Sequence, residues 1–332
     1  MSEALAVIVA MLLLICGKED ETDWDLVLNE ESTFQSFAFG GKTFKLYLPK
    51  RFDENKSYPL MVMLHGCTQD ATDFAMGTNM NQLADDCEFL VLYPQQTQKS
   101  NVKKCWNWFS PSHQKRGKGE PRIIVGMVNK VKSMYNIRDD QVYVAGLSAG
   151  GAMSVILGAT YPDVFSGIGV AAGLEYKAAS NVLGAYASMA SGGPNPIKQG
   201  KLAYKQMGKH ARAVPIIVFQ GTADRTVIQK NAHQVVSQWI VTNDLADNGE
   251  MDDWIRDVTI DVCTEAVPFG RSYTSYTYKI EDNWVVAQKH IIDGMGHAWS
   301  GGNEAGTYTD PQGPDASKIM WEFFMSQSTA VH

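Results

Sequence analysis

The stretch that most constrains this chain is residues 141–154, which read QVYVAGLSAGGAMS. Within it, Gly146, Ser148 and Gly150 form a GxSxG motif that follows a β-type sequence and precedes a helical one. This arrangement is typical of a nucleophile elbow, in which a sharp turn between a strand and a helix holds a serine exposed. Because such a turn is tight and strained, glycines are needed on both sides of the serine. The motif predicts that Ser148 is a nucleophile.

Strand and helix patterns alternate along the rest of the chain. A hairpin is predicted around Gly40 and Gly41, and two β-rich segments at 272–280 and 284–292. Further strands are predicted at 59–64, 88–93, 142–145, 165–172 and 214–219, and helices at 70–87, 122–135, 149–162, 231–241 and after Asp315. We expect residues 245–261 to form an acidic surface insertion. Alternating strands and helices predict an α/β fold, with one mostly parallel sheet covered by helices on both faces.

The composition is that of an ordinary soluble protein and limits the possible partners. The chain has 332 residues, is 45% hydrophobic and 20% charged, and carries a formal net charge of −7. No basic stripe is present, so we do not expect nucleic acid as a partner. Without a linker or an internal repeat, residues 32–332 are predicted to form a single domain. No sequence feature indicates an oligomeric state.

The N-terminal residues 4–16 form an uninterrupted apolar run. This run is shorter than the ~20 residues that a membrane-spanning helix needs, so no stable membrane span is predicted. It is similar to the apolar part of a secretory signal, although Glu3 stands where a basic residue is expected and no small-residue cleavage site follows Cys16. A helix lying on the domain and an imperfect gene start are the alternatives. Residues 18–31 are acidic and are predicted to be an exposed arm, so residues 1–31 are assigned outside the domain.

Five cysteines are present: Cys16, Cys67, Cys87, Cys105 and Cys263. Setting Cys16 aside leaves four, which allow three pairings that the sequence cannot rank. None of them is spaced as CxxC, and no cluster of histidine and cysteine indicates zinc. We therefore expect no metal.

A serine hydroxyl needs a base within hydrogen-bond reach and a third group that orients the base. In open parallel sheets, functional side chains gather on loops at the C-terminal ends of the strands. Ser148, Asp224 and His297 each follow a predicted strand, in the chain order of a known serine triad. In this interpretation His297 takes the proton from Ser148, and Asp224 orients the imidazole and stabilises its charged form.

Other acids and histidines are weaker candidates for these roles. Asp293 is a possible local carboxylate, but it lies very near His297 in the chain. Four rival histidines are interpreted as surface residues: His113, His210, His233 and His290.

The negative charge on a tetrahedral intermediate needs two backbone N–H donors. One is predicted to come from Ala149, at the start of the helix after the nucleophile. The other is assigned to Cys67, in the loop that follows the strand at 59–64. His65 is interpreted as a structural residue that shapes this loop.

Six motifs together resemble the catalytic domain of poly(3-hydroxybutyrate) depolymerases and related esterases. They are HGCTQDATDF (65–74), CWNWF (105–109), GLSAGGAM (146–153), ATYPDVF (159–165), FQGTADRTV (219–227) and GMGHAWSGG (294–302). The resemblance spans residues 33–327. It implies an α/β-hydrolase fold, a triad at Ser148, Asp224 and His297, and hydrolysis of esters of short-chain polyhydroxyalkanoates without a cofactor. It also favours an extracellular or periplasmic location.

The substrate is less constrained than the chemistry. Many secreted members of this family carry a separate polymer-binding domain, and the chain ends at His332 without one. This favours soluble oligomers or other esters over solid polymer as the substrate. Feruloyl and acetylxylan esterases share the elbow and the triad, so an ester on plant polysaccharide is the alternative substrate. A non-catalytic binding protein that retains the fold is a remote alternative.

Two further expectations concern the loops near the predicted site. Trp106, Trp108 and Trp299 lie in loops beside site motifs, and we expect them to form an apolar wall near the ester. Cys67 and Cys105 lie in loops beside the predicted oxyanion hole, and we expect them to form a disulfide.

Overall fold

A ten-stranded sheet runs through the molecule in the order β1-β2-β4-β3-β5-β6-β7-β10-β9-β8. The computed structural model describes residues 33–252, 258–280 and 284–328, so the predicted N-terminal signal and acidic arm lie outside the described residues. The strands of this sheet are β1 (Phe34–Phe39), β2 (Lys42–Tyr47), β3 (Tyr58–Leu64), β4 (Leu90–Gln95), β5 (Ile137–Leu147), β6 (Gly167–Ala171), β7 (Ile216–Gly221), β8 (Thr259–Ala266), β9 (Ser272–Lys279) and β10 (Val285–Ile292). A small separate sheet pairs β11 (Trp299–Ser300) with β12 (Thr309–Asp310).

The centre of the large sheet is parallel. From β4 through β3, β5, β6 and β7 to β10, each strand pairs in parallel with the next. Antiparallel strands flank this centre on both sides: β1 and β2 at one edge, β9 and β8 at the other. The predicted mostly parallel sheet and the hairpin at Gly40 and Gly41 are confirmed. Parallel strands place their C-terminal ends at one edge, where the loops that follow them can meet.

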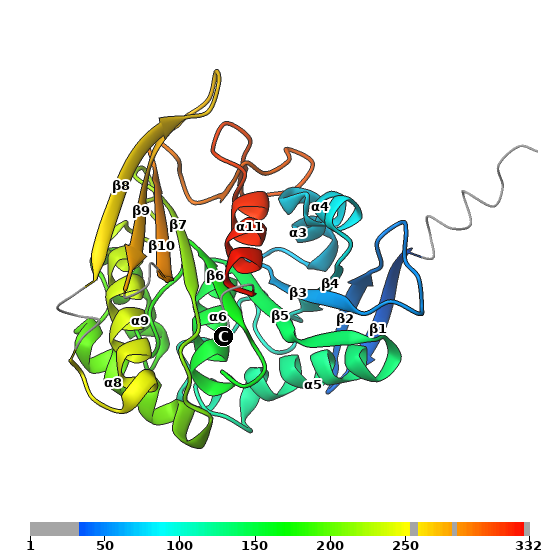
Figure 1. Ribbon diagram of the computed structural model, residues 1–332, viewed down its shortest axis with the longest axis horizontal. Coiled ribbons are helices and arrows are strands. Elements are labelled where there is room, and N and C mark those ends of the chain that lie inside the picture. The colour runs from blue at the N-terminus through cyan, green and yellow to red at the C-terminus, as the bar shows by residue number, and fades with distance from the viewer. Residues whose placement is uncertain (1–32, 253–257, 281–283, 329–332) are drawn as a thin grey trace, which may run out of the picture.

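Helices cover both faces of the sheet (Figure 1). One face carries α3 (Ala71–Thr78), α4 (Met80–Cys87) and α11 (Ala316–Ser328); the other carries α5 (Gly119–Met134), α6 (Ala149–Thr160), α8 (Pro196–Met207) and α9 (Lys230–Asn248). The helix α7 (Val182–Ser191) follows β6, and short 3-10 turns lie at Pro111–His113 and Gly208–His210. Among the described residues, every helix is too short or too polar to cross a bilayer.

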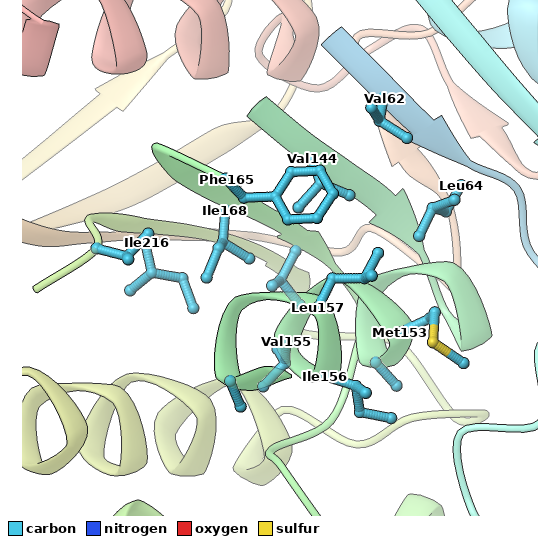
Figure 2. Close-up of a cluster of buried hydrophobic side chains, with 14 of the residues drawn as sticks. Val62, Leu64, Val144, Met153, Val155, Ile156, Leu157, Phe165, Ile168 and Ile216 are labelled. Atoms are coloured by element: carbon cyan, nitrogen blue, oxygen red, sulfur yellow. The ribbon is translucent and has the colours of Figure 1, made fainter. Parts of the chain in front are cut away.

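Each face of the sheet has its own apolar core, because the parallel strands are buried on both sides. Every residue of β3 and of α6 is buried. Figure 2 shows Leu157 of α6 on the side of the helix that faces the strands, where Val144 and Ile168 also lie. The helix after Ser148 is therefore enclosed along its whole length, by the sheet on one side and by α5 and α8 on others.

Two sequence predictions need correction. Residues 70–87 form two helices instead of one, because Asn79 between them has a left-handed backbone with φ 53°. The expected insertion at 245–261 is partly regular structure: α9 extends to Asn248, and β8 begins at Thr259. Every residue of β8 is exposed, so no buried apolar face marked it in the sequence.

We expect Leu157→Ala to lower the free energy of unfolding by about 2–5 kcal/mol, since it removes a fully buried side chain and leaves a cavity. The control is Leu183→Ala on α7, where the leucine is 83% exposed and the change should stay within about 0.5 kcal/mol. Urea unfolding measures both variants. Equal effects of the two changes would contradict the described core.

Candidate active site

Ser148 lies in the turn between β5 and α6 with φ 57° and ψ −116°. A non-glycine residue in this region is strained, and such strain persists only where the surroundings enforce it. The amide of Ser148 donates to the carbonyl of Ala171, at 2.8 Å. A Cβ atom at Gly150 would lie 2.0 Å from the carbonyl oxygen of Leu64, and one at Gly146 would lie 2.7 Å from it. The predicted need for glycine on both sides of the serine is confirmed.

Asp224 and His297 meet beside this elbow. Asp224 follows β7 and His297 follows β10, which are neighbouring parallel strands. His297 Nδ1 lies 2.7 Å from Asp224 Oδ2. The competing carboxylate, Asp293, instead accepts a hydrogen bond from Ser272 Oγ at 2.8 Å. The structure therefore pairs His297 with Asp224.

The Asp224 carboxylate is fully buried and has several donors. Its Oδ1 accepts from the amides of Thr226 and Val227, at 2.8 and 2.9 Å, and its Oδ2 also accepts from Gln220 Nε2 at 3.0 Å. Burial raises the pKa of Asp224, but the hydrogen bond and charge of His297 together with the two amides outweigh burial and lower the pKa below its ordinary value. Asp224 is therefore ionised at neutral pH and can accept a hydrogen bond from the protonated Nδ1 of His297.

His65 shapes the loop before Cys67, as predicted. Its Nε2 lies 3.0 Å from the amide of Gln96, which can only donate, so Nδ1 carries the proton and donates to the carbonyl of Gly66 at 2.7 Å. Burial lowers the pKa of His65 to about 4, which keeps the ring neutral. The indole of Trp106 donates to the carbonyl of His65 at 3.1 Å.

A disulfide joins Cys67 to Cys105, which confirms the expected pairing. Close to it, the amide of Thr68 donates to the carbonyl of Lys103 at 2.6 Å. The loop of Cys67 is thus fixed to the segment that carries Trp106 and Trp108. Among the described residues, Cys87 and Cys263 are free and exposed.

A cavity of about 380 Å³, here called the Ser148 pocket, opens in front of the elbow. Ser148, His297 and Cys67 all line it. Most of the remaining lining comes from the loops and from α7: Gly66, Thr68, Gln69, Asn101, Lys103, Cys105, Trp108, Phe109, Leu147, Val182, Ala185, Tyr186, Met189, Thr226 and Tyr308. The predicted nucleophile, the predicted base and one predicted oxyanion donor therefore share one cavity.

Only one of the three expected tryptophans lines this pocket. Trp108 is part of the lining. Trp106 is fully buried beneath the loop of His65, and Trp299 packs edge-on against Phe74 at 5.4 Å between ring centroids. The expected tryptophan wall is therefore wrong for Trp106 and Trp299, which are core residues.

Several pocket residues were not singled out from the sequence. Helix α7 supplies Val182, Ala185, Tyr186 and Met189, which form much of the apolar lining. This helix lies in a segment rich in Ala, Gly and Ser, and nothing in the sequence pattern there indicated a pocket wall. Gln69 and Tyr308 were also missed, although Gln69 lies within the HGCTQ motif.

None of the four rival histidines lines the Ser148 pocket. His290, interpreted as a surface residue, is buried in β10 and stacks on Phe219 at 4.6 Å between centroids. Its Nδ1 lies 2.9 Å from Ser275 Oγ. Burial lowers the pKa of His290 to about 4.

No group of three or more metal-ligating side chains occurs in the part of the chain that the structure describes.

A mostly parallel sheet with a serine elbow after β5, an acid after β7 and a histidine after β10 defines an α/β-hydrolase fold. Residues 42–252 match the family described as Esterase PHB depolymerase, and the chain belongs to this family.

Curated relatives have several names. The chain is 32% identical over 256 residues to poly(3-hydroxyalkanoate) depolymerase C of Paucimonas lemoignei, covering 75% of this chain and 58% of that protein. It is 29% identical to acetylxylan esterase A of Talaromyces purpureogenus, covering 60% and 53%. It is also 31% identical to feruloyl esterase B of Neurospora crassa, covering 54% and 63%. The chain thus spans little more than half the length of these relatives.

A solved structure supports the fold. The acetyl xylan esterase from Aspergillus awamori superimposes with a TM-score of 0.64 at 21% identity, covering 80% of this chain and 93% of that one.

Stability should fall as the pH drops from about 6.5 to about 4, because His65 and His290 stay neutral in the folded protein while the unfolded chain binds protons. A histidine with a lowered folded pKa loses stability as pH falls through its unfolded pKa, at up to ~1.4 kcal/mol per pH unit. His290→Gln removes one such group and should flatten this slope. Urea unfolding at several pH values measures it; an unchanged slope contradicts a buried, neutral His290.

Proposed function

We propose that the protein is a serine esterase that hydrolyses ester bonds of short-chain polyhydroxyalkanoates or their oligomers through an acyl-enzyme. The observation that carries this proposal is the 2.7 Å contact between His297 and Asp224 in loops beside a strained Ser148. Membership of the Esterase PHB depolymerase family supports the substrate class. So does the name of the Paucimonas lemoignei relative.

In the proposed first step, Ser148 Oγ attacks the ester carbonyl and His297 Nε2 takes its proton. Asp224 accepts from Nδ1 and stabilises the imidazolium that forms. The tetrahedral intermediate collapses when Nε2 returns the proton to the departing alkoxide, which leaves an ester on Ser148. A water molecule, deprotonated by His297, then hydrolyses this acyl-enzyme.

The amides of Cys67 and Ala149 are the proposed donors to the oxyanion. Ala149 is the first residue of α6, so its amide points out of the helix N-terminus, where negative charge is favoured. Within the described part of the chain, no acceptor is bonded to either amide. Both donors are therefore free to bind the developing charge without first breaking another hydrogen bond.

The Ser148 pocket suits a short aliphatic ester. Its volume of about 380 Å³ is at the small end of ligand sites, and Trp108, Phe109 and Met189 give it an apolar wall. These features support hydroxybutyrate-sized units over larger acyl groups.

An extracellular or periplasmic location is part of the proposal. The Cys67–Cys105 disulfide supports it, because such bonds persist in oxidising compartments.

Feruloyl or acetylxylan esterase activity is the second candidate, supported by the names of two relatives. Side-by-side rates on hydroxybutyrate trimer, methyl ferulate and acetylated xylan separate the candidates. We expect the trimer to be cleaved fastest. A higher kcat/KM on ferulate or on acetylated xylan would replace the leading proposal with the second.

We expect Ser148→Ala to reduce turnover of a short-chain nitrophenyl ester by several powers of ten, because it removes the nucleophile. Asp224→Asn should lower kcat by ~10⁴, since an amide that donates to Nδ1 favours the wrong tautomer of His297. Asp293→Asn is the matched control and should keep nearly full activity. If the Asp293 variant lost as much activity as the Asp224 variant, the assignment of the acid would be wrong.

A further inference from the structure

Gln69 joins two loops that both line the Ser148 pocket. Its side chain is buried, with the residue 2% exposed. Gln69 Oε1 accepts from the amide of Gly66 at 2.8 Å, and Nε2 donates to the carbonyl of Thr307 at 2.9 Å. Gly66 directly precedes Cys67, and Thr307 directly precedes Tyr308. One side-chain amide therefore connects the proposed oxyanion loop to a segment 238 residues later in the chain.

The segment of Tyr308 is in turn bonded to the loop of His297. The amide of Trp299, close after His297 in the chain, donates to the carbonyl of Tyr308 at 2.7 Å. Strands β11 and β12 pair Trp299 with Thr309 in the same place. The ring of Tyr308 lies edge-on to that of His297, with centroids 6.4 Å apart. Gln69 thus links the proposed oxyanion donor and the proposed base through a few hydrogen bonds.

Asp73 fixes the orientation of the Gln69 amide. Asp73 Oδ2 accepts from Gln69 Nε2 at 3.1 Å, while Oδ1 accepts from the amide of Thr307 at 2.8 Å. A flipped amide would place Oε1 against a carboxylate and a carbonyl oxygen, both of which only accept. A Cβ atom on Gly66 would lie 3.0 Å from Gln69 Oε1, so the absence of a side chain there permits the close approach.

We propose that Gln69 is a positioning residue for ester hydrolysis. It holds the Cys67 amide in a fixed position relative to the loop of His297. This inference rests on the proposed function. Removing one oxyanion donor typically costs ~10²–10³ in kcat, because the donor must be in place before charge develops. The disulfide fixes the Cys67 loop to Cys105, and Gln69 supplies a second attachment, toward the histidine.

The test compares Gln69→Met with Gln234→Met. Gln234 is also a buried glutamine that joins backbone groups: Oε1 accepts from the amide of Gly193 at 2.8 Å, and Nε2 donates to the carbonyl of Pro194 at 2.8 Å. It is not part of the pocket lining. Both variants lose one bonded acceptor and one bonded donor, so both should lose stability. Only Gln69→Met should lose catalysis.

For Gln69→Met we expect kcat on a short-chain nitrophenyl ester to fall ~10²-fold, with KM changed less than about threefold. The inhibition constant of an alkyl boronic acid, whose serine adduct places an oxygen in the oxyanion hole, should rise by a similar factor. Gln234→Met should leave all three values unchanged. Equal kcat losses in the two variants, or an unchanged boronate inhibition constant in Gln69→Met, would overturn the inference.

A second variant keeps the test decisive if Gln69→Met does not fold. Gln69→Glu has the same length and retains an acceptor for the amide of Gly66, but it loses the donor to Thr307. It should also lower kcat with little change in KM, and full activity would count against the inference. Wild-type protein and Ser148→Ala are assayed together with the variants. An inactive wild type would refute the proposed function itself, whereas an active wild type with an unaffected Gln69 variant refutes only the role of Gln69.

Discussion

The strained backbone at Ser148 is the constraint on which the rest of the site depends. A serine with φ 57° can be held only if the strand before it and the helix after it are both fixed. The buried end of β5 and the wholly buried α6 provide this. Gly146 and Gly150 pack so closely against the carbonyl of Leu64 that a side chain at either position would collide with it. Core packing on the sheet therefore determines where the hydroxyl points.

The other groups of the site follow from the sheet order. Because β7 and β10 are adjacent and parallel, Asp224 and His297 reach each other directly from the loops that follow them. On the opposite side of the elbow, the loop after β3 carries Cys67. His65, Trp106 and a disulfide hold this loop in place. A buried, neutral histidine and a buried tryptophan thus serve the shape of the site, while the chemistry is assigned to other side chains.

The sequence predicted the elbow, the Asp224–His297 pair and the parallel sheet because each leaves a local pattern: glycines around a serine, or polar residues directly after an apolar strand. It did not distinguish Trp108 from Trp106 and Trp299, because burial of a loop tryptophan depends on what packs above it. Helix α7 was missed as a pocket wall since its small residues give only a weak helical pattern. Gln69 was missed because its two partners lie in loops that meet only in the folded protein.

The central claim is that Ser148 carries the acyl group during turnover. The most direct measurement is mass spectrometry of peptides after hydroxybutyrate trimer has been mixed with the protein and quenched in acid within milliseconds. The account predicts a hydroxybutyryl-type acyl group on the peptide that contains Ser148, and none on that peptide in Ser148→Ala. Active turnover with no adduct on Ser148, or with an adduct on a different residue, would contradict it.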